Sequence, residues 1–192
     1  MIEDIKNVIG DICNSIANGD SSKLKEVIED FGTYCFKEDT AGQKFNDDIF
    51  NLILEMMGKP EFLNMEGADN LLMLFEFDWA MLTHFQKEKL SNAIEHSYDK
   101  YKYWMSCFVL SKLLGEYYCS ESAFQVLCRL ASSSKEIPRS LIPMAFEYLA
   151  RGSSDSALKD KSITELKKMA DDPSKQVQKE AVDSLNRLTI KR

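Results

Sequence analysis

The stretch Asp172-Pro-Ser-Lys-Gln-Val-Gln-Lys-Glu-Ala-Val-Asp-Ser-Leu185 has the spacing of a helix that must pack against a neighbour. Val177, Ala181 and Leu185 recur at every fourth residue, so they form a single apolar stripe along one helix face. The small side chain of Ala181 in the middle of that stripe allows a second helix to approach closely. The pattern therefore predicts a helix over 174–188 that packs its stripe against a preceding helix over 156–170.

The start of the same stretch carries the signals of a helix N-terminus. Asp172 can cap the first turn, and Pro173 stands where a missing N–H is tolerated. The order Asp-Pro, then Val, Ala and Leu, resembles the second helix of a HEAT-type repeat, although Gln178 stands where many such repeats carry Arg. The resemblance covers residues 172–188 and implies stacked antiparallel helix pairs, an architecture that commonly binds macromolecules along a long surface.

The rest of the chain also favours helices. Only 8 Gly and 4 Pro occur in 192 residues, which argues against a fold rich in strands and tight turns. Polar residues 37–44 predict a loop, and Pro143 predicts either a kink in its helix or a later start. No linker marks a boundary, so we expect one all-α domain over 1–192, a short HEAT-like solenoid of about ten helices. The helices expected are 2–17, 20–31, 46–57, a short one from Pro60, one from Asp69 into 71–82, 86–99, 101–117, 121–132, 139–151, 156–170 and 174–188.

Composition points to a cytoplasmic protein. The N-terminal residues show no basic region followed by an apolar one, so we expect no secretory signal. No apolar run approaches the roughly 20 residues of a membrane helix, so we expect no membrane partner. The five cysteines are odd in number and widely spaced, and none forms a Cys-x-x-Cys pair. This pattern is typical of reduced thiols in a cytoplasmic protein.

Charge is unevenly distributed along the chain. Residues 1–80 hold 17 acidic against 6 basic residues, whereas residues 81–192 hold 14 against 18. An acidic half repels the phosphates of nucleic acids and attracts basic protein surfaces, so we expect a protein partner and no nucleic acid. The alternative is that these carboxylates only line solvated helix faces.

The acidic half supplies the candidate binding residues. The block over 71–82 is almost entirely apolar, apart from two carboxylates beside Trp79, and Trp is often an anchor at protein interfaces. Alternatively, Asp78 only caps a helix that starts at Trp79. We expect the partner-binding residues to be Glu38, Asp39, Asp47, Asp48, Glu55, Glu76, Asp78 and Trp79.

Aromatic residues gather in a second segment, 98–124. Tyr101 and Trp104 fit a core stripe, whereas Tyr98, Tyr103 and Tyr117 fall off it and are expected nearer to solvent. Stacking of these rings on nucleic-acid bases has little support, because only two lysines lie nearby.

Motifs for chemistry are missing from the sequence. His84 and His96 are the only histidines, and neither has the spacing of a metal site or a catalytic triad. There is no glycine-rich phosphate loop and no Gly-x-Ser-x-Gly turn. We therefore expect no catalytic residues, no metal, no cofactor and no enzymatic activity.

A small, acidic, helical protein without catalytic motifs is similar to the immunity proteins of bacterial toxin systems, including contact-dependent growth inhibition. That resemblance implies an acidic surface that neutralises a cognate toxin, often a nuclease with a basic active site. One alternative is a general HEAT-like scaffold or adaptor. A second is a HEAT-like DNA glycosylase, which needs a basic concave surface and is disfavoured by the sequence pI near 5.0.

Overall fold

The computed structural model describes residues 2–31, 36–39 and 42–189. Within these residues the chain forms eleven α-helices, so the expected all-α fold of about ten helices is confirmed. The helices group into two compact units, Met1–Ser106 and Cys107–Arg192, which we describe separately. The single domain expected over 1–192 stays a prediction.

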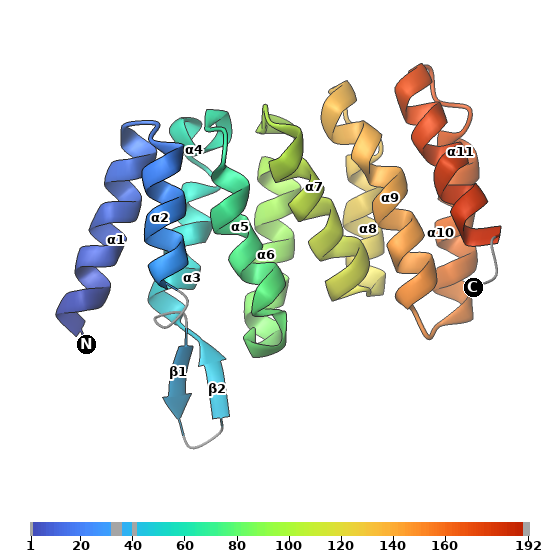
Figure 1. Ribbon diagram of the computed structural model, residues 1–192. Coiled ribbons are helices and arrows are strands. Elements are labelled where there is room, and N and C mark those ends of the chain that lie inside the picture. Colours follow the sequence, from blue (N-terminus) through green and yellow to red (C-terminus); the bar gives the residue numbers. More distant parts are fainter. Residues whose placement is uncertain (1, 32–35, 40–41, 190–192) are drawn as a thin grey trace. The chain divides into compact units, whose positions relative to one another are not determined.

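The first unit is built from helix pairs and one hairpin (Figure 1). Helix α1 packs against α2 and α4, α2 also packs against α5, and α3 packs against α6. Its elements are α1 (Ile2–Ala17), α2 (Ser21–Phe31), β1 (Phe36–Asp39), β2 (Gly42–Phe45), α3 (Asp47–Met56), α4 (Pro60–Asn64), α5 (Ala68–Phe77), η1 (Trp79–Met81), α6 (His84–Ser97), η2 (Tyr98–Lys100) and the start of α7 (Trp104–Lys112).

The loop predicted over 37–44 is wrong for residues 37–39 and 42–44, and residues 40–41 lie outside the described residues. Strands β1 and β2 pair antiparallel there, with Phe36 opposite Phe45. Phe45 is fully buried, and its ring centre lies 6.4 Å from that of Phe50 and 5.6 Å from that of Phe75. The polar composition of this segment predicted a loop because composition does not reveal that Phe45 is buried in the core. The buried ring of Phe45 fixes the end of β2 to the core of the first unit.

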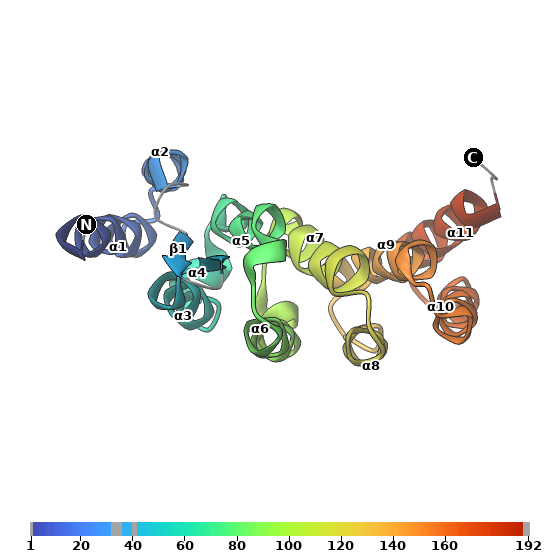
Figure 2. The same cartoon turned by 90° about the horizontal axis from the view of Figure 1, so that it is seen from below.

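The second unit forms two layers of helices (Figure 2). Helices α9 and α11 lie side by side in one layer, and α8 and α10 lie in the other. Its elements are the rest of α7, the π-helix η3 (Leu113–Tyr118), α8 (Glu121–Leu130), α9 (Glu136–Gly152), α10 (Ser156–Met169) and α11 (Lys175–Thr189).

The stripe that predicts the last helix is buried as expected. Val177 and Ala181 on α11 are inaccessible to solvent, and Leu185 is half-buried. Helix α11 packs against α9 as well as against α10, so the stripe fills a three-helix contact rather than a single pair.

The N-terminal cap of α11 is Ser174 rather than the predicted Asp172, which instead binds the residues just before the helix. Oδ1 of Asp172 accepts a hydrogen bond from the Ser174 N–H at 2.8 Å, and its Oδ2 lies 3.1 Å from Nε of Arg139 on α9. Ser174 in turn accepts from the Val177 N–H in the first turn of α11. Gln178, the residue that departs from the HEAT pattern, donates its Nε2 to the Asp172 carbonyl at 2.7 Å. The chain entering α11 is thus fixed to α9 by side chains.

Three expectations about individual residues need correction. Helix α9 begins at Glu136 and continues through Pro143, so a later start at the proline is wrong. Trp104, expected in the core, is 56% exposed, whereas Tyr98, expected nearer to solvent, is fully buried. Tyr98 lies in the short turn η2 and Trp104 is the first residue of α7, so the helical spacing that was used to predict their burial applies to neither ring.

Candidate interaction surface

A tight connection between α5 and α6 forms the most distinctive surface of the first unit. Helix α5 ends at Phe77, the chain turns through η1, and Thr83 starts α6. Thr83 and Gln86 form a capping box in which Thr83 Oγ1 accepts from the Gln86 N–H and Gln86 Oε1 accepts from the Thr83 N–H at 2.9 Å. These bonds hold the first turn of α6, and therefore Phe85, in a defined position.

Two large apolar side chains on this connection face solvent. Phe77 is 70% exposed and Phe85 is 63% exposed, the highest values for large apolar side chains among the described residues. Nζ of Lys89 lies 4.6 Å from the ring centre of Phe85. We call the surface formed by Phe77, Asp78, Trp79, Phe85 and Lys87 the aromatic corner.

Sequence reasoning missed both phenylalanines. Phe77 lies in an apolar block that was interpreted as core, and Phe85 was not considered. The capping signature Thr83-x-x-Gln86 could have revealed Phe85, because it predicts a helix start that places Phe85 in the first turn.

The middle of the aromatic corner is partly shielded from water. Trp79 is half-buried, and Nζ of Lys87 lies 5.1 Å from its ring centre. Burial lowers the pKa of Lys87 and raises the pKa of Asp78. The Asp78 side chain makes no capping hydrogen bond to η1, so the structure does not support a capping role for it.

Several of the predicted acidic residues lie beside this corner. Asp47 Oδ1 accepts a hydrogen bond from Nε2 of Gln86 at 3.0 Å, which joins the start of α3 to the start of α6. Asp48 is exposed next to it, and Glu76 precedes Phe77 in the last turn of α5. The bond to Gln86 thus places Asp47 at the start of α6, and Glu76, Asp78 and Trp79 lie on the chain segment that leads into that helix.

Other predicted residues do not join them. Glu55 lies near the opposite end of α3 from Asp47, about 12 Å along the helix axis. Its carboxylate pairs with Nζ of Lys59 at 2.7 Å. Glu38 and Asp39 belong to β1, opposite Gln43 and Gly42, but their side chains lie outside the described residues.

The unequal charge follows the division into units. Met1–Ser106 holds 20 acidic and 10 basic residues, a net charge of −10, whereas Cys107–Arg192 holds 11 and 14, a net charge of +3. The aromatic corner therefore belongs to a strongly acidic unit. Such a unit favours the approach of a positively charged partner.

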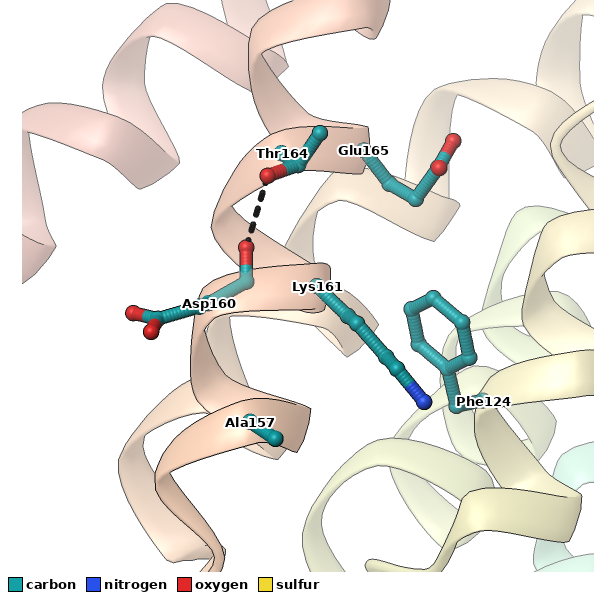
Figure 3. Close-up of a pocket in the computed structure, with 6 residues that line it drawn as sticks. All are labelled: Phe124, Ala157, Asp160, Lys161, Thr164 and Glu165. Atoms are coloured by element: carbon teal, nitrogen blue, oxygen red, sulfur yellow. Dashed lines mark hydrogen bonds between the residues drawn. The ribbon is translucent and has the colours of Figure 1, made fainter.

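A groove of about 560 Å³ lies between α8 and α10 in the second unit (Figure 3). Lys161 extends towards Phe124, with Nζ 5.9 Å from the ring centre, and pairs with Glu121 at 2.9 Å. Glu165 pairs with Lys168 at 2.6 Å. Because these charged groups already have partners within the chain, the groove offers little to recognise a ligand.

No cluster of three or more His, Cys, Asp or Glu side chains that could hold a metal ion occurs in the part of the chain that the structure describes. Likewise, none of the helices described combines the length and the apolar character needed to cross a membrane.

Comparison with protein-family models, with curated proteins and with solved structures found no match to this chain. Any functional assignment therefore depends on the residues and geometry described above.

Proposed function

We propose that this chain is a non-enzymatic protein-binding module that uses the aromatic corner and its acidic surroundings to bind a partner with a basic surface. The observation that carries the proposal is the solvent exposure of Phe77 and Phe85 beside Trp79 and the carboxylates of Asp47 and Asp48. Exposed apolar side chains that gather in one patch are typical of interaction sites, whereas single ones occur on any protein surface.

The two kinds of residue in this region have different roles. Aromatic side chains at the centre of an interface supply much of the binding energy, because they are fully removed from water on binding. The surrounding carboxylates steer a basic partner towards the corner and mainly increase the association rate. The same negative charge repels phosphates, which argues against a nucleic-acid partner and against the glycosylase alternative.

Within this class we favour an immunity protein that works in the cytoplasm and neutralises a cognate nuclease-type toxin. An enzyme that acts on nucleic acids has a basic active site, and an acidic unit with aromatic anchors is complementary to it. A general scaffold or adaptor is the alternative. It uses the same surface but protects against no toxin.

The test is co-expression of the full chain with the toxin domain encoded beside it in the genome, with growth as the readout. We expect the chain to restore growth. Phe77→Ser and Phe85→Ser should each raise the dissociation rate of the purified complex by about tenfold or more. The matched control is Ile137→Ser, which removes an exposed apolar side chain from α9 and should leave the dissociation rate unchanged.

Three outcomes separate the possibilities. A genome with no toxin domain beside this chain contradicts the immunity assignment and leaves the adaptor. Protection that survives both phenylalanine substitutions contradicts the use of the aromatic corner. Turnover of a substrate by the purified chain would contradict the non-enzymatic proposal itself.

A further inference from the structure

A polar pocket of about 510 Å³ lies in the first unit, away from the aromatic corner in sequence. It is formed where the end of α1 meets the start of α2, the short helix α4 and the segment that precedes α7. The residues used below are Ile16–Gly19, Glu61, Asn64, Met65, Glu66 and Tyr103, all of which line the pocket.

The charge of this pocket is entirely negative. Glu61 and Glu66 contribute carboxylates, and the lining contains no Lys, Arg or His. The pocket also contains the C-terminal end of α1, where the helix dipole is negative, and the last turn of α1 has no basic residue to offset it. The nearby Lys59 and Lys23 pair with Glu55 and Glu26, at 2.7 and 3.0 Å respectively.

The pocket also has walls that suit the rest of a long basic side chain. Ile16 and Met65 line the pocket and are the apolar side chains that a methylene stem would contact there. Tyr103 is half-buried and can offer its ring to a cation. Asn64 adds an amide group. The carboxylates of Glu61 and Glu66 and the ring of Tyr103 line the same pocket, and both kinds of group favour a cation.

We propose that this pocket binds an arginine side chain of the basic partner; the inference rests on the proposed function and names the group that the acidic unit recognises. A guanidinium fits better than an ammonium for two reasons. Its planar fork of donors can bond to two carboxylates and to carbonyl oxygens at once, and its flat face stacks on a tyrosine ring. Lysine offers only a compact point charge.

The experiment uses the full chain labelled with ¹⁵N and N-acetyl-arginine methylamide as the probe, followed by amide chemical shifts. We expect saturable shifts at Gly19, Asn64 and Glu66, with a Kd on the order of 1 mM for a single side chain. The citrulline analogue has nearly the same shape without the charge and should not bind. The lysine analogue should bind about fivefold or more weakly, and equal binding of lysine or of spermidine would overturn the assignment to arginine.

Two variants with the same change in charge make the test specific. Glu61→Gln with Glu66→Gln should weaken arginine binding by about tenfold. The control pair, Asp11→Asn with Glu29→Gln, removes two exposed carboxylates from α1 and α2 and should leave the Kd unchanged. An equal loss of arginine binding in both double variants, or amide chemical shifts that do not saturate, would mean that arginine is attracted only by the overall negative charge of the unit.

Failure of this inference can be told apart from failure of the proposed function. If arginine does not bind but Phe77→Ser still weakens the partner complex, the pocket assignment is wrong and the proposed function stands. If arginine binds and the phenylalanine variants have no effect on the complex, the pocket is the recognition site and the role of the aromatic corner is wrong.

Discussion

Gly115 lies directly against the backbone of Ala145: a Cβ atom added to Gly115 would stand 2.3 Å from the Ala145 carbonyl oxygen. The contact joins η3 to α9, and η3 is the stretch where α7 continues as a π-helix. Only a residue without a side chain allows the two helices to approach this closely. A backbone carbonyl cannot rotate away as the end of a flexible side chain can, so this contact fixes the spacing of the two elements.

Gly115→Ala should therefore destabilise the protein by about 3 kcal/mol, because the added methyl group forces η3 and α9 apart. In most helices the same substitution is stabilising. The matched control is Gly10→Ala in α1, where nothing lies within 4 Å of the added Cβ. It should stabilise the fold by about 0.5–1 kcal/mol. Urea unfolding followed by circular dichroism measures the free energy of unfolding of both variants. Equal changes in the two variants would contradict the close approach of Gly115 to Ala145.

Ala181→Glu tests the packing of α11. The substitution places an unpaired carboxylate in a contact that is closed to solvent, and it should lower the free energy of unfolding by about 3–5 kcal/mol. Val182→Glu is the control, since Val182 is 45% exposed on the same helix and should tolerate the charge. A thermal melt of Ala181→Glu that matches the wild type would show that α11 does not pack through this stripe.

The cysteines should remain reduced and react slowly in the native protein. Cys13, Cys107, Cys119 and Cys128 are free thiols, whereas Cys35 lies outside the described residues. Burial raises the pKa of Cys119, and it raises that of Cys128 to about 11, so at pH 8 the thiolate fraction of Cys128 is about 100-fold below that of an ordinary thiol. Alkylation counted by mass spectrometry should be slow at Cys128 until urea is added.

The same shift predicts how stability depends on alkaline pH. Between pH 9 and about 11 the unfolded chain loses the Cys128 proton while the folded chain keeps it, so stability should fall as the pH rises through this window. Cys128→Ser should show a smaller fall. Disulfide-linked peptides in a non-reduced digest of the native protein would contradict the reduced state.

Charge steering should depend on the carboxylates beside the aromatic corner. Removing two charges with Asp47→Asn and Asp48→Asn should lower the association rate for the basic partner by about threefold to tenfold at low salt. The difference should shrink as salt is raised, because salt screens exposed charges. The control is Asp160→Asn with Asp171→Asn, an equal change of charge in the second unit. Equal loss in both variants would indicate a general effect of net charge.

Much of the fold follows from local patterns that need no tertiary information. The caps and apolar spacing predicted α1, α3 and α10 to within a residue or two of their observed ends. This succeeds because a cap and an amphipathic stripe act within one or two helical turns. The apolar stripe of Val177 and Ala181 likewise predicted which face of α11 is buried.

The candidate site was predictable only in part. Charge counting found the acidic unit and named Asp47, Asp48 and Asp78, and composition drew attention to Trp79. The exposure of Phe77 and Phe85 was missed, because an apolar residue looks the same in a sequence whether it is covered or not. What covers a residue is decided by neighbouring elements, and at this corner the described residues leave most of both rings exposed.

The sequence by itself determined that the chain is helical, where most of its helices begin, and that its charge is concentrated in one half. These properties depend on side chains within a few residues of each other. Tertiary structure alone decided that Phe45 anchors a hairpin, that Gly115 meets Ala145 and that Glu61 shares a pocket with Tyr103. Each of these joins residues far apart in the chain, and such contacts are set by how whole helices pack rather than by any local pattern.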